Sequence, residues 1–145
     1  MRRFAACCGL ALLVACAKSE QQDHASMASI SLADVAGTWN LKTMASNSDS
    51  VLVAFDLVAT ADTTGWTYNF PGRAPEPVRV LAVAGDSIVT HTGPYASVLR
   101  PGVQVTVHGV LRLHDGKLMG TSMATYSGGG PDSVITLRTE GTRAP

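Results

Sequence analysis

Residues 102–126 read GVQVTVHGVLRLHDGKLMGTSMATY, and apolar residues alternate with polar ones on both sides of Asp115-Gly116. An Asp-Gly pair between two alternating runs is typical of a β-hairpin with a two-residue type I′ turn. A loop of those two residues puts Val105 opposite Tyr126. One face of the hairpin is then apolar or small and the other is mixed and polar. The register is well specified, because a slip of one residue would exchange the two faces.

The rest of the chain, from Asp34 onward, shows the same kind of pattern. Alternation with a period of two residues, β-branched side chains and closely spaced turn signals dominate, and no stretch has a clear helical period. The predicted strands cover residues 37–45, 51–59, 65–70, 77–84, 86–92, 102–114, 117–126 and 133–142. About eight short strands with short connections predict an all-β domain, an antiparallel up-and-down barrel, with a β-sandwich as the alternative.

One longer irregular stretch, residues 92–102, interrupts this series and contains Gly93, Pro94 and Pro101. Its apolar residues, Tyr95 and Leu99 among them, indicate that it packs onto the domain. Two roles are open for it, a structural crossover and a cap over one end of the barrel. We expect the crossover.

The interior is expected to combine small and aromatic residues. Small residues occupy inner-face positions of the hairpin where bulk would be expected: Gly109, Gly120, Ser122 and Ala124. They suit a tightly curved sheet, or they leave room for large residues opposite. Trp66, Tyr68 and Phe70 share one face of their strand, and Tyr126 faces inward from the hairpin. These four side chains are expected to fill the core, with the wall of a ligand cavity as the alternative.

Few residues are arranged for catalysis or for metal binding. His108 and His114 lie about 20 Å apart on one strand at ~3.4 Å per residue, so they cannot share a metal ion. The sequence contains no G-x-S-x-G motif, and the triple glycine at 128–130 lies between predicted strands rather than before a helix. We therefore expect no enzyme, no metal site and no cofactor.

The charge balance argues against a nucleic-acid partner. The chain has 145 residues with 11 basic and 11 acidic side chains. Without Arg2 and Arg3 near the start, the rest of the chain has a slight excess of acidic residues. It also has no stretch in which aromatic and basic residues alternate, as they do in many nucleic-acid-binding sequences.

The N-terminal segment has the composition of an export signal. Met1-Arg2-Arg3 is basic, and residues 4–15 are apolar and uncharged, about half of the ~20 residues that a membrane-spanning helix needs. Its end, Leu13-Val14-Ala15-Cys16, resembles the lipobox of bacterial lipoproteins. The resemblance implies that residues 1–15 are a signal peptide and that Cys16 carries a thioether-linked lipid. An ordinary secretory signal cut after Ala15 is the alternative.

The segment that follows is small, polar and aperiodic, so residues 16–33 are expected to form a lipid-anchored flexible tether before a β-barrel domain at 34–145. Ala17, rather than Asp, follows the lipobox. In a bacterium with two membranes the resemblance then implies the outer membrane, facing the periplasm. The segment also resembles that of small lipoproteins from environmental bacteria, which implies no activity.

Gly37-Thr38-Trp39 opens the first predicted strand and resembles the G-x-W motif of the lipocalin and calycin barrels. The resemblance implies a barrel in which Trp39 closes one end and packs against an arginine of the last strand. Arg143 has the matching position, and cation–π attraction would join the two side chains.

These observations lead to two expectations for function. The first is a membrane-anchored envelope lipoprotein whose barrel binds a small apolar ligand or an envelope component. The second is a structural or protein-interaction lipoprotein whose barrel is filled by its own side chains. A hydrolase or metalloenzyme has the least support.

Overall fold

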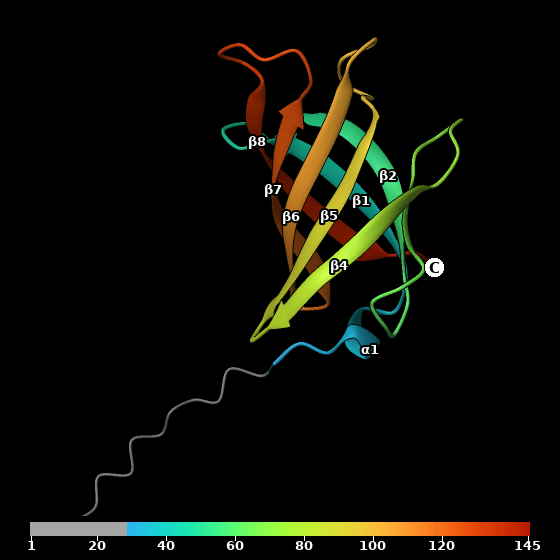
Figure 1. Ribbon diagram of the computed structural model, residues 1–145. Coiled ribbons are helices and arrows are strands. Elements are labelled where there is room, and N and C mark those ends of the chain that lie inside the picture. Colours follow the sequence, from blue (N-terminus) through green and yellow to red (C-terminus); the bar gives the residue numbers. More distant parts are fainter. Residues whose placement is uncertain (1–28) are drawn as a thin grey trace, which may run out of the picture.

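The computed structural model describes residues 29–145, which form a closed eight-stranded antiparallel barrel in chain order, preceded by one short helix (Figure 1). The elements are α1 (Leu32–Val35), β1 (Gly37–Ala45), β2 (Val51–Ala59), β3 (Trp66–Asn69), β4 (Glu76–Ala84), β5 (Ser87–Ala96), β6 (Gln104–His114), β7 (Lys117–Tyr126) and β8 (Val134–Arg143). Within the described residues, no helix is long and apolar enough to cross a bilayer. The predicted signal peptide, the lipidation site at Cys16 and most of the predicted tether lie outside the described residues.

The predicted up-and-down barrel is confirmed, and the β-sandwich alternative is excluded because β1 pairs with β8 as well as with β2. The β6–β7 hairpin has the predicted register, with Val105 opposite Tyr126 and Leu113 opposite Leu118. Asp115 and Gly116 have φ angles of 50° and 73°, the left-handed conformation that a type I′ turn requires. This hairpin fixes which side chains of β6 and β7 face the interior.

The domain begins slightly before residue 34, where the sequence analysis placed its boundary. The Ser31 hydroxyl accepts a hydrogen bond from the Asp34 amide, and the Asp34 carboxylate accepts one from the Ser31 amide, so a capping box starts α1. Ile30 and Leu32 pack against the core. The helix α1 was not predicted, because a single helical turn is too short to show a period in the sequence.

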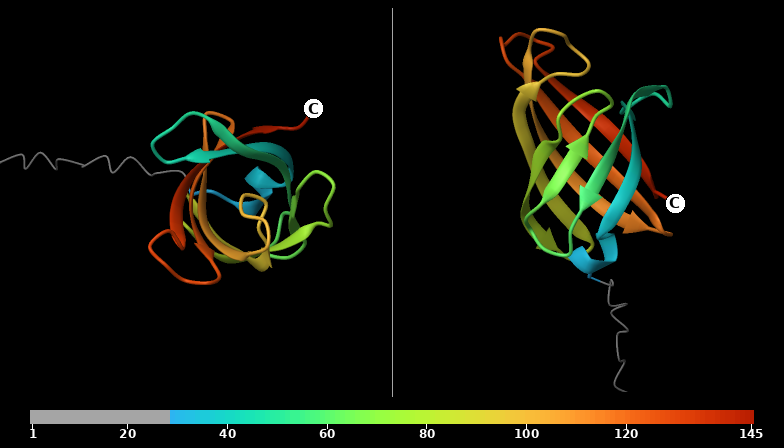
Figure 2. Two further views of the ribbon diagram at one scale, coloured as in Figure 1. Left: turned by 90° about the horizontal axis from the view of Figure 1, so that it is seen from above. Right: turned by 90° about the vertical axis from the view of Figure 1, so that its right-hand side faces the viewer.

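The expected crossover at residues 92–102 is wrong. β5 continues to Ala96 and pairs with β6, so the connection at residues 97–103 is a hairpin loop. Figure 2 shows this β5–β6 loop lying over the interior of the barrel when the molecule is seen from above. The second role considered from the sequence, a cap over one end, is the one that the structure has.

The interior side chains form two clusters rather than one continuous core. The larger cluster surrounds Trp39 and Trp66 at the end that α1 covers. The smaller cluster contains Val105, Tyr126 and Leu137 near the opposite end. A cavity lies where the two clusters meet, because residues of both contribute to its wall.

Candidate functional site

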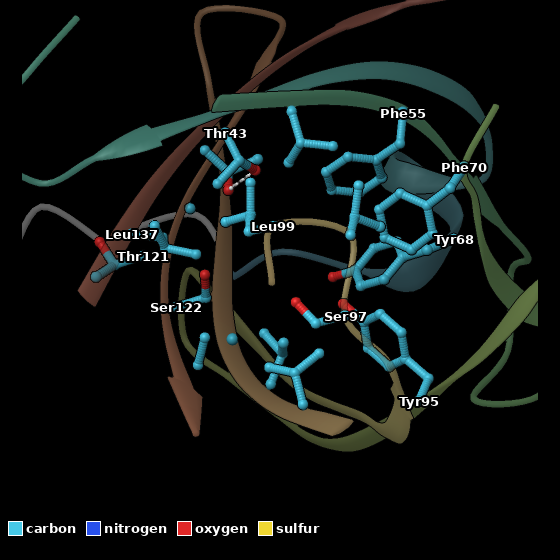
Figure 3. Close-up of a pocket in the computed structure, with 18 of the residues that line it drawn as sticks. Thr43, Phe55, Tyr68, Phe70, Tyr95, Ser97, Leu99, Thr121, Ser122 and Leu137 are labelled. Atoms are coloured by element: carbon cyan, nitrogen blue, oxygen red, sulfur yellow. Dashed lines mark hydrogen bonds between the residues drawn. The ribbon is translucent and has the colours of Figure 1, made fainter. Parts of the chain in front are cut away.

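The interior of the barrel contains a cavity of about 60 Å³ beneath the β5–β6 loop (Figure 3). All eight strands except β4 contribute residues to its wall, together with the loop itself. A volume of this size holds a few water molecules, but it is smaller than the roughly 150 Å³ that takes up benzene in a protein interior. In the closed state the barrel is therefore mostly filled by its own side chains.

One side of the cavity is an aromatic wall formed by Phe55 of β2, Tyr68 of β3, Phe70 after β3, and Tyr95 of β5. The Phe55 ring centroid lies 5.0 Å from that of Tyr68 in an edge-to-face arrangement and 4.7 Å from that of Phe70. Phe70 also stacks on Tyr95 at 5.8 Å. These distances are those of favourable aromatic pairs, so the wall is held in place by contacts among its own rings.

The other side is lined by small residues of β6 and β7, including Gly109, Gly120 and Ser122. A Cβ atom on Gly120 would lie 2.7 Å from Leu111 Cδ2, and one on Gly109 would lie 2.8 Å from Thr90 Oγ1. The glycines thus make room for side chains on the neighbouring strands, and the aromatic rings do not occupy the space above them. At these positions the wall has no side-chain bulk, whereas Val107, Leu111 and Tyr126 of the same two strands line the cavity beside them.

The β5–β6 loop closes the top of the cavity. Val98 and Leu99 both line the cavity, and Leu99 points into the barrel (Figure 3). Two arginines restrain the loop and its base: Arg73 donates to the carbonyl of Ala96, the last residue of β5, at 2.6 Å, and Arg100 of the loop donates to the Asp132 carbonyl at 2.8 Å. The Arg100 guanidinium also lies 3.9 Å above the Tyr126 ring. The loop is attached by contacts near the surface rather than by strand pairing.

The described residues that line the cavity carry no charge, and its polar groups are hydroxyls. Thr43 and Thr139 share a hydrogen bond of 2.9 Å in the wall. Burial raises the pKa of Tyr68, although a hydrogen bond with Thr90 opposes this shift. Burial also raises the pKa of Tyr95 far above its usual range. Both phenols are therefore neutral at physiological pH.

The aromatic residues chosen from the sequence occupy different places. Tyr68, Phe70 and Tyr126 line the cavity. Trp66 does not; it is buried in the larger cluster, and its Nε1 donates to the carbonyls of Asp62 at 2.9 Å and Thr60 at 3.2 Å. Trp66 thus fills the core at the end opposite the β5–β6 loop.

That end is closed by Trp39 and Arg143. Trp39 is fully buried and donates from Nε1 to the Val35 carbonyl at 2.7 Å, and the Arg143 guanidinium lies 4.4 Å from its ring centroid. Arg143 also donates to the carbonyls of Asp34 at 2.5 Å and Ala36 at 2.8 Å. A Cβ on Gly37 would lie only 2.9 Å from Arg143 Nη1, so glycine leaves room for the guanidinium. The residues of the G-x-W motif thus tie α1 to the last strand.

The histidines of the outer face do not form a metal site with acidic groups. His91 and His108 are cross-strand neighbours with ring centroids 4.6 Å apart, and His114 lies at the far end of β6. Among residues 29–145, no three His, Cys, Asp or Glu side chains come together as metal ligands do.

Most residues of the cavity wall were absent from the set of site residues chosen from the sequence, Phe55, Tyr95 and Leu99 among them. The alternation of residues placed Phe55 on the inner face of its strand, but no signal in the sequence indicated that its ring would contact the aromatic residues of β3. Gly93 and Pro94 form a bulge within β5 that the sequence analysis read as the end of the strand. For Tyr95 and Leu99 the only signal in the sequence was their apolar character. It indicated that they pack onto the domain, but not that they line the interior cavity.

Comparisons with protein-family models, with curated proteins and with solved structures find no match to this chain.

Proposed function

We propose that this chain is a membrane-anchored envelope lipoprotein whose barrel binds a small, neutral, apolar molecule. A lipid on Cys16 would hold it at the membrane, in the outer membrane facing the periplasm if the host has two membranes. The observation that carries the binding proposal is the cavity, which has an aromatic wall and is closed on one side only by the β5–β6 loop.

The chemistry of the wall selects the class of ligand. Moving an ionised group into an uncharged cavity is costly unless a partner of opposite charge is present, and the described wall offers none. The rings of Phe55, Phe70 and Tyr95 suit an aliphatic chain or another ring. Hydroxyls such as that of Ser122 suit at most one or two hydrogen bonds. A short-chain alcohol or a small aromatic molecule fits this description.

Binding requires the β5–β6 loop to move. The closed cavity is smaller than benzene needs, and the half-buried Leu99 occupies part of the space that a ligand would use. Leu99 therefore acts as an internal competitor, and the measured affinity is reduced by the small fraction of molecules in which the loop is open.

The second candidate is a structural or protein-interaction lipoprotein without an internal ligand. The small volume of the closed cavity favours it, because the barrel is then nearly complete without any guest. An envelope protein would be its partner, bound on the outside of the barrel.

Titration calorimetry with toluene and with 1-hexanol separates the two candidates. We expect saturable binding of one molecule per chain. Leu99→Ala should strengthen it several-fold, because it removes the internal competitor. Ser122→Leu should abolish it by filling the cavity. Leu52→Ala, on the outside of β2 with 44% of its surface exposed, is the matched control and should bind as the unmodified chain does.

The absence of saturable heat in both the unmodified chain and Leu99→Ala, with both proteins folded by circular dichroism, would reject the ligand proposal in favour of the filled barrel. Undiminished binding to folded Ser122→Leu would place the ligand outside the cavity and would reject it equally.

A further inference from the structure

The tip of the β4–β5 hairpin is apolar and exposed. Residues 81–84 read Leu-Ala-Val-Ala, and every residue from Leu81 to Asp86 is exposed. Leu81 exposes 52% of its surface and Val83 exposes 41%. Large apolar side chains concentrated at a hairpin tip are an unfavourable arrangement in water, and such a cluster marks a contact surface.

The local pairing explains why the tip is exposed. The register of β4 with β5 shifts between Val80 and Ala82, so Leu81 has no partner residue in the ladder. Beyond this bulge the hairpin tip lies at the end of the barrel that carries α1, at about the level of this helix (Figure 1). No other element of the described chain covers its apolar residues.

The N-terminal segment leaves the domain at this same tip. The Ile30 amide donates a hydrogen bond of 2.8 Å to the Gly85 carbonyl in the turn of the hairpin. Cys16 precedes Ile30 by only fourteen residues in the sequence. A lipid on Cys16 would therefore be tethered to the barrel at the end where the apolar tip lies.

Other connections at this end of the barrel are polar, which makes the tip distinctive. The β6–β7 turn is formed by Asp115 and Gly116 and is followed by Lys117, and the β2–β3 loop contains Asp62. At the tip itself, Asp86 forms an ion pair with Arg112 at 3.3 Å. The charge of Asp86 is thus balanced locally and does not oppose contact with a lipid surface.

We propose that the β4–β5 tip is a second membrane contact, with Leu81 and Val83 inserted into the interfacial region of the bilayer. This inference rests on the proposed lipid anchor at Cys16 and adds an orientation to it. The α1 end of the barrel faces the membrane, and the β5–β6 loop faces away from it. A ligand then reaches the cavity from the aqueous compartment rather than sideways from the bilayer.

The test uses the full lipidated chain, in which an introduced cysteine is the only free thiol once Cys7 and Cys8 have left with the signal peptide. Leu81→Cys is labelled with a polarity-sensitive fluorophore and reconstituted into phosphatidylcholine vesicles that contain a quencher on the acyl chains. Two matched positions serve as controls. Lys117→Cys reports on a polar turn at the same end, and Val134→Cys reports on an exposed apolar residue at the opposite end, with 47% of its surface exposed.

We expect the label at position 81 to shift to shorter wavelength and to be quenched several-fold more than the labels at positions 117 and 134. Equal quenching at 81 and 117, or none at 81 while the lipidated protein sediments with the vesicles, would overturn the tip contact and leave the anchor standing. A chain whose intact mass shows no lipid, and which stays in the supernatant, would instead overturn the anchor and with it the inference built on it.

Discussion

At the scale of single residues, Arg143 joins the last strand to α1 and to the buried Trp39 at the α1 end of the barrel. Its guanidinium bonds two carbonyls of the segment that contains α1 and lies over the buried Trp39 ring. A planar guanidinium can do all three at once because its donors lie in a fixed plane and its face is free for stacking, whereas an ammonium group cannot. We therefore assign to Arg143 the closure of this end of the barrel.

Arg143→Met is expected to lower the free energy of unfolding by about 1–3 kcal/mol, through the loss of charge-assisted hydrogen bonds and of the cation–π contact. Arg143→Lys should fall between Met and the unmodified chain. Urea denaturation monitored by fluorescence measures the free energy of unfolding of both variants. Arg79→Met, on the exposed outer face of β4, is the control and should change stability by no more than about 0.5 kcal/mol. Equal stability of Arg143→Met and the unmodified chain would show that the contacts of Arg143 contribute nothing.

A second residue-scale effect concerns Asp62 in the β2–β3 loop. Its carboxylate accepts hydrogen bonds from the Thr64 amide at 2.7 Å and the Thr64 hydroxyl at 2.8 Å, and these hold its pKa below the ordinary value of 3.8. Its own carbonyl accepts from Trp66 Nε1, so the turn and the core residue are linked.

Because the folded state lowers this pKa, the carboxylate contributes stability above about pH 3.8 and the contribution is lost as the pH falls through the folded-state pKa. Asp62→Asn should therefore show a weaker dependence of stability on pH below 4 than the unmodified chain. A pH titration of the folded chain followed by carbon-detected NMR gives the pKa of the Asp62 carboxyl directly. An Asp62 pKa at or above its ordinary value would contradict the assigned hydrogen bonds.

At the scale of elements, the β6–β7 hairpin was predictable, whereas β5 was predicted only as far as Thr92 and its continuation to Ala96 was not. The hairpin has a turn dipeptide with a single favoured geometry and two alternating runs beside it, so local sequence determines its register. In β5, Gly93 and Pro94 are residues that usually end a strand, but here they form a bulge. The bulge brings Tyr95 to the interior and carries the strand on to Ala96. Whether such a pair ends a strand or kinks it depends on the partner strand, which one-dimensional patterns do not contain.

The β5–β6 loop is the element whose motion the proposed function requires. Its amides bond within the loop, from Ser97 to the Val103 carbonyl and from Arg100 to the Ser97 hydroxyl. Among the side-chain hydrogen bonds of the described chain, that of Arg100 ties the loop to the β7–β8 connection, and that of Arg73 holds Ala96 just before the loop. Local opening can therefore occur without disrupting the ladder of the barrel.

Arg100→Ala is expected to speed hydrogen exchange at the amides of residues 97–103 several-fold, because it removes the bond to Asp132 and the contact with Tyr126. Strand amides should exchange as before. Arg112→Ala, which breaks a surface ion pair at the opposite end of the barrel, is the control. Unchanged exchange in the loop of Arg100→Ala would mean that this arginine does not restrain the loop.

At the scale of the whole molecule, the sequence predicted the all-β up-and-down barrel and the small and aromatic residues of its interior, but it placed a crossover where a hairpin loop lies. It could not predict whether a cavity exists. Core filling and a cavity wall require the same aromatic residues with the same alternation, and the outcome depends on how side chains from seven strands and a loop fill the remaining space. Tyr68 and Trp66 illustrate this, since they are two residues apart on one face and yet only Tyr68 reaches the cavity.

The anchor is a separate property of the whole molecule and has its own test. Cys16→Ser should release the protein from the membrane fraction, because it removes the site of the thioether, and the loss of several buried acyl chains abolishes firm attachment. Cell fractionation with immunoblotting measures the share of the protein in the membrane fraction. Membrane partitioning that is the same with and without Cys16 would refute lipidation at this residue.

The proposed function requires that the barrel takes a small neutral guest under the β5–β6 loop. Intermolecular nuclear Overhauser effects between 1-hexanol and the isotope-labelled protein test it most directly, because they locate the guest atom by atom. We expect contacts from the hexanol methylenes to the rings of Tyr68 and Phe70 and to Ser122, with stronger signals in Leu99→Ala. A folded protein whose only contacts with hexanol lie on the outer surface, or that shows none in either form, would contradict it.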